Sequence, residues 1–259
     1  STDEEGVSGS ASPQDLELML QLTYLYFTAP RADSVAFATL EQQVRASLAN
    51  RGASPEVAFG DTLDALLTRH NRRTRPFTAD RVREMDLGRS LAIYRDRFAD
   101  AGDFTFVFVG NVSADSLRPL AEKYLASLPS SGRKERARDL GIRPPAGIVE
   151  RTVRRGTEPK ARTVIVFTGP LAAFTRRERL AVGALADVLD IQLRETLREQ
   201  LGGTYGVQVG AQTEHDPAPH YSLSIDFGSA PDLVASLTTA LFAQLDTLRT
   251  RGPSRRPPG

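Results

Sequence analysis

Leucine residues recur at every fourth position over one stretch of the chain and predict an amphipathic helix of about 25 residues that begins near Thr175. They are Leu185, Leu189, Leu193, Leu197 and Leu201. Gly202 follows and supplies the left-handed residue that commonly ends a helix. Apolar residues then alternate with polar or small ones over residues 205–212, which predicts a half-buried strand. This order places Arg198 in the last helical turn and Tyr205 at the start of the strand.

Similar periodicities predict the other elements. Apolar residues three and four apart predict helices over residues 13–29, 34–51, 54–69, 78–98, 113–128 and 231–249. Alternating, β-branched or aromatic runs predict strands over residues 104–109, 149–153, 163–168 and 221–227, with a hairpin loop at 213–220. The combination indicates an α+β fold.

Composition and charge exclude several classes of protein. The 259 residues are 40% hydrophobic and 25% charged, which fits neither a collagen-like nor a disordered chain. The net charge of +1 gives no reason to expect nucleic acid or an anionic membrane as a partner. The chain has no cysteine, so disulfides and thiolate sites are excluded. Residues 1–6 are acidic where a signal peptide would be basic, so either there was none or residue 1 is not the native start.

Arg198 and Tyr205 have a structural and a functional interpretation. A cation in a last helical turn favours the helix dipole, and a tyrosine suits a strand face. Residues 197–207, however, resemble a segment in the non-catalytic half of the pitrilysin/insulinase (inverzincin) family of zinc metallopeptidases, where a tyrosine follows seven positions after an arginine. The resemblance implies that Arg198 and Tyr205 donate hydrogen bonds to the carbonyl of the peptide being cut. A guanidinium and a phenol are suitable donors to a carbonyl oxygen that gains negative charge.

A short internal repeat indicates a modular chain. Residues 9–16 and 228–233 are near copies, and each opens an amphipathic helix. About 75 residues of one module precede the second copy, so we expect the chain to enter one module part-way and to leave another part-way. The family resemblance implies repeated α/β modules with antiparallel-dominated sheets covered by helices, the LuxS/processing-peptidase-like metallopeptidase fold, with both modules incomplete.

On this interpretation residues 1–130 form the later part of a first module and residues 131–148 a linker rich in proline, glycine and charge. Residues 149–259 form the early part of a second module, which carries the arginine and tyrosine pair and ends in an atypical tail, residues 250–259. The resemblance is to long bacterial members, which are often periplasmic. We therefore expect a fragment of such a protein in the periplasm, with the cytoplasm as the alternative.

The chain lacks the residues of the family's zinc site. That site needs an H-x-x-E-H motif and a distant glutamate, whereas this chain has only His70, His215 and His220. We therefore expect zinc in the parent enzyme but not in this segment. A metal among Glu214, His215, Asp216 and His220 is an alternative to a solvated loop, although their spacing matches no known motif. The chain also has no G-x-S-x-G motif.

The leading hypothesis is the non-catalytic, substrate-binding half of a zinc-dependent endopeptidase. It binds a peptide substrate, and a zinc-bearing N-terminal half on the same or another chain supplies metal, water and base. Such a segment is not expected to hydrolyse peptides alone. The alternative is a structural or peptide-binding assembly subunit with no catalytic share. Because incomplete modules leave sheet edges and apolar helix faces uncovered, we also expect self-association.

Overall fold

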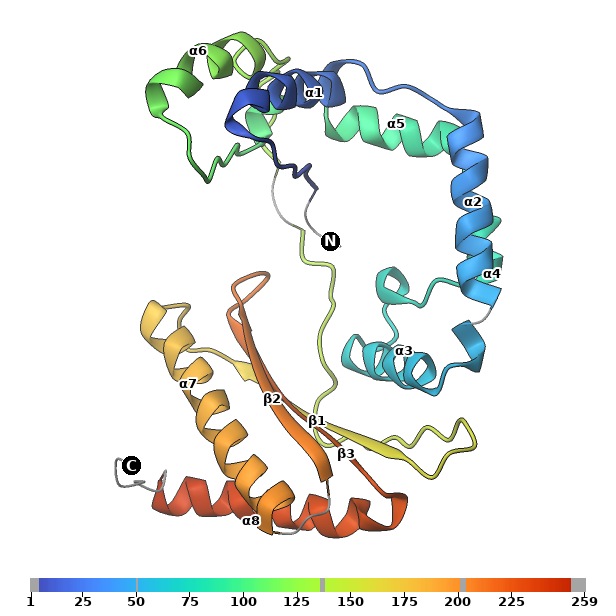
Figure 1. Ribbon diagram of the computed structural model, residues 1–259, viewed down its shortest axis with the longest axis vertical. Helices are drawn as coiled ribbons and strands as arrows, with labels where there is room; N and C mark the ends of the chain where they lie inside the picture. The colour runs from blue at the N-terminus through green and yellow to red at the C-terminus, as the bar shows by residue number, and fades with distance from the viewer. Residues whose placement is uncertain (1–4, 50, 136–137, 201–203, 253–259) are drawn as a thin grey trace. The chain divides into compact units, whose positions relative to one another are not determined.

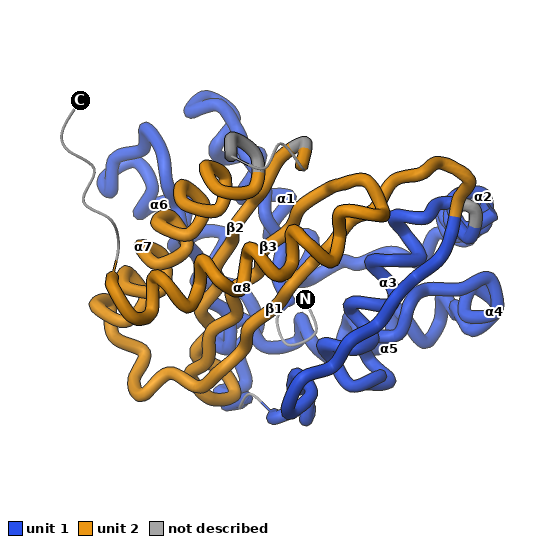
Figure 2. Tube along the Cα trace, turned by 90° about the horizontal axis from the view of Figure 1, so that it is seen from below, with its two compact units in different colours: residues 1–155 blue, residues 156–259 orange. Residues whose placement is uncertain are grey.

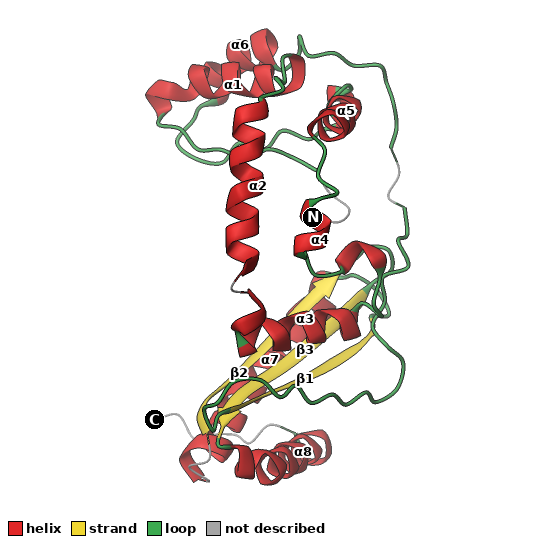
Figure 3. Ribbon diagram, turned by 90° about the vertical axis from the view of Figure 1, so that its right-hand side faces the viewer, coloured by secondary structure: helices red, strands yellow, loops and turns green. Residues whose placement is uncertain are grey.

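The computed structural model describes residues 5–49, 51–135, 138–200 and 204–252. The chain divides into two compact units, unit 1 (residues 1–155) and unit 2 (residues 156–259) (Figure 2). The strands of the described residues all belong to unit 2, whereas the described part of unit 1 is built from helices (Figure 3). That residues 131–148 link two modules stays a prediction.

Unit 1 confirms most of the helices that were predicted for it. Its described α-helices are α1 (Leu16–Thr28), α2 (Ser34–Ala49), α3 (Pro55–Leu67), α4 (Ala79–Val82), α5 (Leu87–Arg97) and α6 (Ala114–Tyr124) (Figure 1). Short 3-10 turns lie between or before them: η1 (Pro13–Asp15), η2 (Arg51–Ala53), η3 (Arg72–Thr74) and η4 (Ala101–Asp103). Serine side chains cap α3 and α6, because Ser54 accepts a hydrogen bond from Val57 N and Ser113 accepts one from Ser116 N.

The single helix predicted over residues 78–98 is wrong, because the structure divides it into α4 and α5. The carboxylate of Asp86 accepts a hydrogen bond from Arg89 N at 2.6 Å and acts as the N-cap of α5. The apolar periodicity runs through the break. Periodicity alone therefore could not show where one helix stops and the next begins.

Aromatic rings hold α1 against α5. Phe27 of α1 meets Phe98 edge-on, with ring centroids 5.1 Å apart, and Tyr94 stacks on Phe98 at 4.3 Å. Leu128 is buried in the same cluster. Such ring pairs contribute about 1 kcal/mol each beyond the area that they bury, so the cluster is the core that joins these helices.

The strands predicted over residues 104–109 and 149–153 are wrong. In the first segment the side chains do alternate, because Phe104 and Phe106 pack on the aromatic cluster whereas Val107 is 76% exposed. A strand also needs hydrogen bonds to a neighbouring strand. Neither segment belongs to the sheet that the described residues form. The β-branched and aromatic composition of residues 104–109 therefore could not show that a partner strand is missing among the described residues.

A buried carboxylate secures the turn that follows α5. Asp100 Oδ2 accepts hydrogen bonds from the Ser131 hydroxyl at 2.5 Å and from Arg133 N at 2.7 Å, and Oδ1 accepts one from Gly102 N at 2.9 Å. These bonds, above all the one from Ser131, hold the pKa of Asp100 well below its ordinary value of 3.8, although burial acts in the opposite direction.

Acid is therefore expected to destabilise unit 1 through Asp100. Because the folded pKa is depressed, the stabilising contribution is complete above the ordinary carboxyl pKa and is lost as the pH falls toward the folded value. In urea unfolding followed by circular dichroism, Asp100→Asn should be less stable than wild type at neutral pH, and the difference should narrow below about pH 4. Asp80→Asn, at an exposed position, is the control. A difference that stays constant with pH would contradict the prediction.

Unit 2 is an antiparallel three-stranded sheet with helices packed on one face. Its described elements are β1 (Ala161–Pro170), α7 (Arg176–Leu193), η5 (Arg194–Gln200), β2 (Thr204–Glu214), β3 (His220–Ser229), η6 (Pro231–Leu233) and α8 (Val234–Arg251) (Figure 1). The strand order is β1-β3-β2, which confirms the predicted strands at these places and the hairpin between β2 and β3. α7 begins with a capping box formed by Thr175 and Glu178.

The core of unit 2 lies between this sheet and its two long helices. Alternate residues of β3 are buried, as expected for a strand with one covered face. The buried residues come from α7, η5, α8 and two strands: Ala186, Leu189, Leu193, Leu197, Val207, Leu223, Ile225, Phe227, Leu237 and Leu241. Three leucines of the predicted stripe, Leu189, Leu193 and Leu197, thus belong to this core, whereas Leu185 at its start is 45% exposed. The last leucine of the stripe, Leu201, lies outside the described residues.

The two copies of the internal repeat have the same local structure. Pro13 starts η1, which is closed by a hydrogen bond from Asp15 N to Ser12 O at 3.0 Å. Pro231 starts η6, which is closed by a bond from Leu233 N to Ala230 O at 3.1 Å. Each turn leads directly into a long helix, α1 or α8. The sequence repeat is therefore also a structural repeat at this point.

Candidate substrate-binding site

The segment that carries Arg198 is a π-helix, which corrects the prediction of one regular helix up to Leu201. After α7 the hydrogen-bond pattern changes, and η5 (Arg194–Gln200) is π-helical over seven residues. Leu193 and Leu197 are fully buried on either side of the change, so the segment stays anchored in the core. π-Helical turns are rare and frequently occur at functional sites. The predicted cap at Gly202 lies outside the described residues.

Tyr205 lies at a second irregularity, a β-bulge at the start of β2. Thr204 is opposite Ser229 on β3, and Gly206 is opposite the preceding residue, Gly228. Two steps along β2 therefore match one step along β3, and Tyr205 is the extra residue. Bulges bend a strand, redirect side chains and are over-represented next to active sites.

The backbone positions of Arg198 and Tyr205 agree with the predicted end of a helical segment and the predicted start of a strand. Both segments join one core, because Leu197 of η5 and Val207 of β2 are buried in the same cluster. The side chains of Arg198 and Tyr205 lie outside the described part of the structure. Their role in substrate binding therefore stays a prediction.

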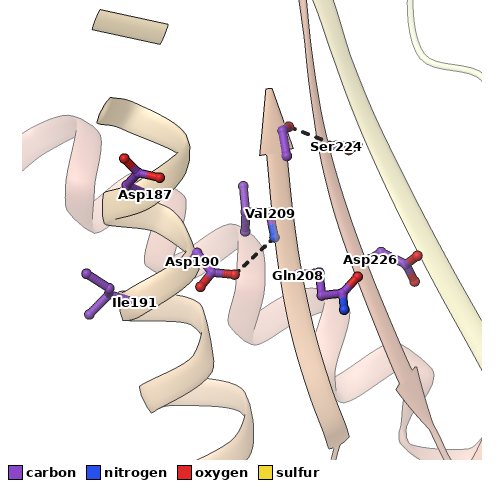
Figure 4. Close-up of a pocket in the computed structure, with 8 residues that line it drawn as sticks. Asp187, Asp190, Ile191, Gln208, Val209, Ser224 and Asp226 are labelled. Atoms are coloured by element: carbon purple, nitrogen blue, oxygen red, sulfur yellow. Dashed lines mark hydrogen bonds between the residues drawn. The ribbon is translucent and has the colours of Figure 1, made fainter. Parts of the chain in front are cut away.

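Asp190 connects the helix before Arg198 to the strand after Tyr205 (Figure 4). Its Oδ1 accepts a hydrogen bond from Val209 N on β2 at 3.1 Å, and its Oδ2 pairs with the guanidinium of Arg194. The bond from Val209 N is charge-assisted, because a carboxylate accepts it. The contact fixes α7 against β2, and both candidate residues lie in the chain between its two partners, Asp190 and Val209.

A polar pocket of about 710 Å³ lies beside this contact (Figure 4). It is lined by Asp187, Asp190 and Ile191 of α7, Gln208, Val209 and Gly210 of β2, and Ser224 and Asp226 of β3. Asp226 is bound by the guanidinium of Arg162, at 3.1 Å to Nε and 2.6 Å to Nη2. Two of the three carboxylates therefore already have a cationic partner.

The polar groups at the hairpin tip, among the residues that the structure describes, lie in pairs. At the hairpin tip, His220 Nε2 lies 3.5 Å from Glu214 Oε2, while His215 Nδ1 lies 3.2 Å from Asp216 Oδ1. The described residues contain no group of three or more histidine, aspartate or glutamate side chains that could hold a metal ion. The four loop residues considered above thus form two separate pairs.

Two residues of this site, Thr204 and Asp190, were not identified from the sequence. Thr204 has the pattern of an ordinary β-branched strand residue, and no spacing marks a bulge. Asp190 sits one position after Leu189 of the leucine stripe, and a carboxylate beside an apolar stripe is the one signal that could have identified it. Its acceptor role depends on β2, whose position relative to α7 the sequence does not give.

Comparison with known proteins places this arrangement in a family. Residues 89–256 match the model of the family described as "Peptidase M16 inactive domain". The chain belongs to this family. This confirms the predicted relationship to the non-catalytic part of the pitrilysin/insulinase peptidases. Among the described residues, no helix has both the length and the apolar character that crossing a membrane requires.

Relatives of this M16 domain are much longer than the chain. The chain is 25% identical over 253 residues to the probable zinc protease PqqL of Haemophilus influenzae. This alignment covers 96% of the chain and 26% of the relative. Two solved structures have the same fold. The periplasmic protease PqqL from Escherichia coli matches with a TM-score of 0.79 at 23% identity, over 92% of this chain and 26% of that one.

The second structure is a mutant of the ferredoxin protease FusC in complex with Arabidopsis ferredoxin. It matches with a TM-score of 0.73 at 19% identity, over 93% of this chain and 26% of that one. These likenesses confirm the predicted α+β metallopeptidase fold. The chain spans about a quarter of the length of each of these three proteins.

Proposed function

We propose that this M16 domain is part of the substrate-binding, non-catalytic half of a zinc-dependent endopeptidase. In this proposal Arg198 and Tyr205 donate hydrogen bonds to the carbonyl oxygen of the scissile peptide bond. The observation that carries the proposal is the position of both residues on backbone irregularities, a π-helix and a β-bulge, that flank one buried core. Both kinds of irregularity are enriched at functional sites.

The chemistry suits these two side chains. Arginine stays charged at all relevant pH values and has several N–H donors, and the tyrosine phenol adds a neutral O–H donor. When a peptide bond is attacked, its carbonyl oxygen gains negative charge, and fixed donors stabilise that charge more strongly than they stabilise the substrate. Residues of this chain would thus bind and orient the carbonyl. A partner half that carries the H-x-x-E-H motif would hold the zinc ion, which activates water in such enzymes.

The named relatives support a polypeptide as the substrate. The ferredoxin protease was solved in complex with ferredoxin, which is a protein. The structural neighbour PqqL is described as a periplasmic protease, which supports our proposal that this chain also acts in the periplasm. The catalytic half is proposed as its main partner, on the same chain or another.

Tyr205→Phe tests the proposal by removing a single hydroxyl. In the protease assembled with a catalytic half, we expect kcat/KM to fall about 100-fold, because one donor to the developing charge is lost. Most of the loss should be in kcat, since the interaction strengthens in the transition state. Steady-state kinetics on a quenched fluorescent peptide would measure both constants.

The matched control is Tyr221→Phe, which removes the same group from β3 of the same sheet and should leave both constants near the wild-type values. Equal activity of Tyr205→Phe and wild type would refute the role of the phenol. If the peptide still bound but neither donor affected turnover, the chain would be an assembly subunit instead.

A further inference from the structure

Thr204 occupies an unusual place for a polar side chain. It begins β2 and is only 9% exposed, and the residue opposite it, Ser229, is 2% exposed. Burying a hydroxyl costs free energy unless the hydroxyl makes hydrogen bonds. The hydrogen-bond partners of Thr204 therefore indicate which part of the structure its side chain stabilises.

The partners of the Thr204 hydroxyl are the backbone groups on both sides of the bulge. Oγ1 lies 2.9 Å from Gly206 O and 2.5 Å from Gly228 O, and it accepts a hydrogen bond from Gly206 N at 3.2 Å. A hydroxyl has one proton to donate, which either carbonyl can accept. One side-chain atom therefore contacts β2 after the bulge and β3 opposite it.

This contact bears directly on Tyr205. Val207 and Phe227 are paired, and both are buried on the core face of the sheet. If the pairing continued without a break, Tyr205 would lie opposite Ser229, also on the core face. The extra residue instead gives that place to Thr204 and leaves Tyr205 with no residue opposite it.

We propose that Thr204 is a positioning residue for Tyr205: its hydroxyl closes the β-bulge and so sets the backbone from which the tyrosine reaches the substrate. The inference rests on the proposed function, because it assumes that Tyr205 acts on the peptide. The methyl group of Thr204 suits the buried, extended position. Among substitutions of Thr204, serine is the one that keeps a hydroxyl at the same place.

The test uses the complete protease, assembled with its catalytic half, and a double-mutant cycle. Thr204→Val keeps the shape and removes the hydroxyl, and we expect kcat to fall roughly 10- to 100-fold, as for a small misplacement of a reacting group. KM should change less than about twofold. Thr204→Ser should restore most of kcat. In the Tyr205→Phe background, Thr204→Val should cause almost no further loss, because the group that it positions is already gone.

Ser229→Ala is the matched control, since Ser229 carries a buried hydroxyl directly opposite Thr204, and that hydroxyl donates a hydrogen bond to Ala230 O at 3.0 Å. It should leave kcat near wild type. If Thr204→Val folds poorly, hydrogen exchange of a peptide covering residues 204–207 in the Thr204→Ser protease replaces the kinetic test. Exchange there should be as slow as in wild type, and faster exchange with full kcat would overturn the proposal.

The possible failures are distinguishable. If Tyr205→Phe alone leaves kcat unchanged, the proposed function of the tyrosine fails, and the positioning role fails with it. If Tyr205→Phe is impaired but Thr204→Val lowers kcat by the same factor in both backgrounds, only the positioning role is overturned. A decrease in kcat that Thr204→Ser does not rescue would overturn it as well.

Discussion

Peptide hydrolysis is expected only when this chain is combined with a half that carries an H-x-x-E-H motif and zinc. The chain has three histidines, and its described residues contain no cluster of ligands that could hold the metal. Without metal, activated water and base, two hydrogen-bond donors cannot cut a peptide bond. A quenched fluorescent peptide library with added zinc would be assayed with the chain alone, with the catalytic half alone and with the mixture.

Three controls make this result interpretable. A chelator should abolish activity of the mixture, and readdition of zinc should restore it. Full activity of the catalytic half alone would show that this chain is dispensable for turnover and would favour the assembly role. Activity of this chain alone, insensitive to chelation, would contradict the family-based proposal altogether.

Replacing Arg198 by alanine should have the largest effect of any single substitution in this chain. In the assembled protease we expect kcat/KM to fall about 1000-fold, or about 4 kcal/mol, the upper end for one lost donor, because arginine brings a full charge. Arg198→Lys should recover only part of this, since an ammonium group cannot reproduce the planar fork of donors. The measurement is steady-state kinetics together with the unfolding midpoint of each variant.

Arg194→Ala is the matched control for this prediction. Arg194 begins the same π-helix and pairs with Asp190, and its side chain is 47% exposed. Loss of a partly exposed ion pair of this kind typically costs less than about 1 kcal/mol of stability, so turnover should remain within a few-fold of wild type. If Arg198→Ala behaved like Arg194→Ala, Arg198 would be an ordinary cation near a helix end.

The parts of the fold that could be predicted from sequence are those set by local periodicity. The stripe that includes Leu189 and Leu193 is buried on α7, and the alternation in β3 buries Ile225 and Phe227 as expected. These predictions were correct because a helix or strand with one buried face needs apolar residues at the period of that element. The strand at residues 104–109 failed for the complementary reason, since pairing depends on chain that lies elsewhere.

The candidate site shows the same division. The positions of Arg198 and Tyr205 at a helix end and a strand start followed from the order of apolar residues and glycine. The π-helix, the bulge and the contacts of Asp190 and Thr204 could not be predicted in this way. Each depends on how two elements pack against or pair with one another. These features are properties of the packing between segments, so the residue pattern of one segment alone does not predict them.

The neighbouring π-helix and β-bulge also limit what changes of length this segment can accept. In a helix, one residue more or less turns everything beyond it by about 100°, and in a strand it transfers every later side chain to the opposite face. Within residues 194–200 and 204–206, an insertion or deletion therefore changes the direction of the side chains beyond it. A one-residue deletion in either of these two segments would therefore reorient the candidate donor that the segment carries, so the length of each segment matters to the site as much as the identity of its donor.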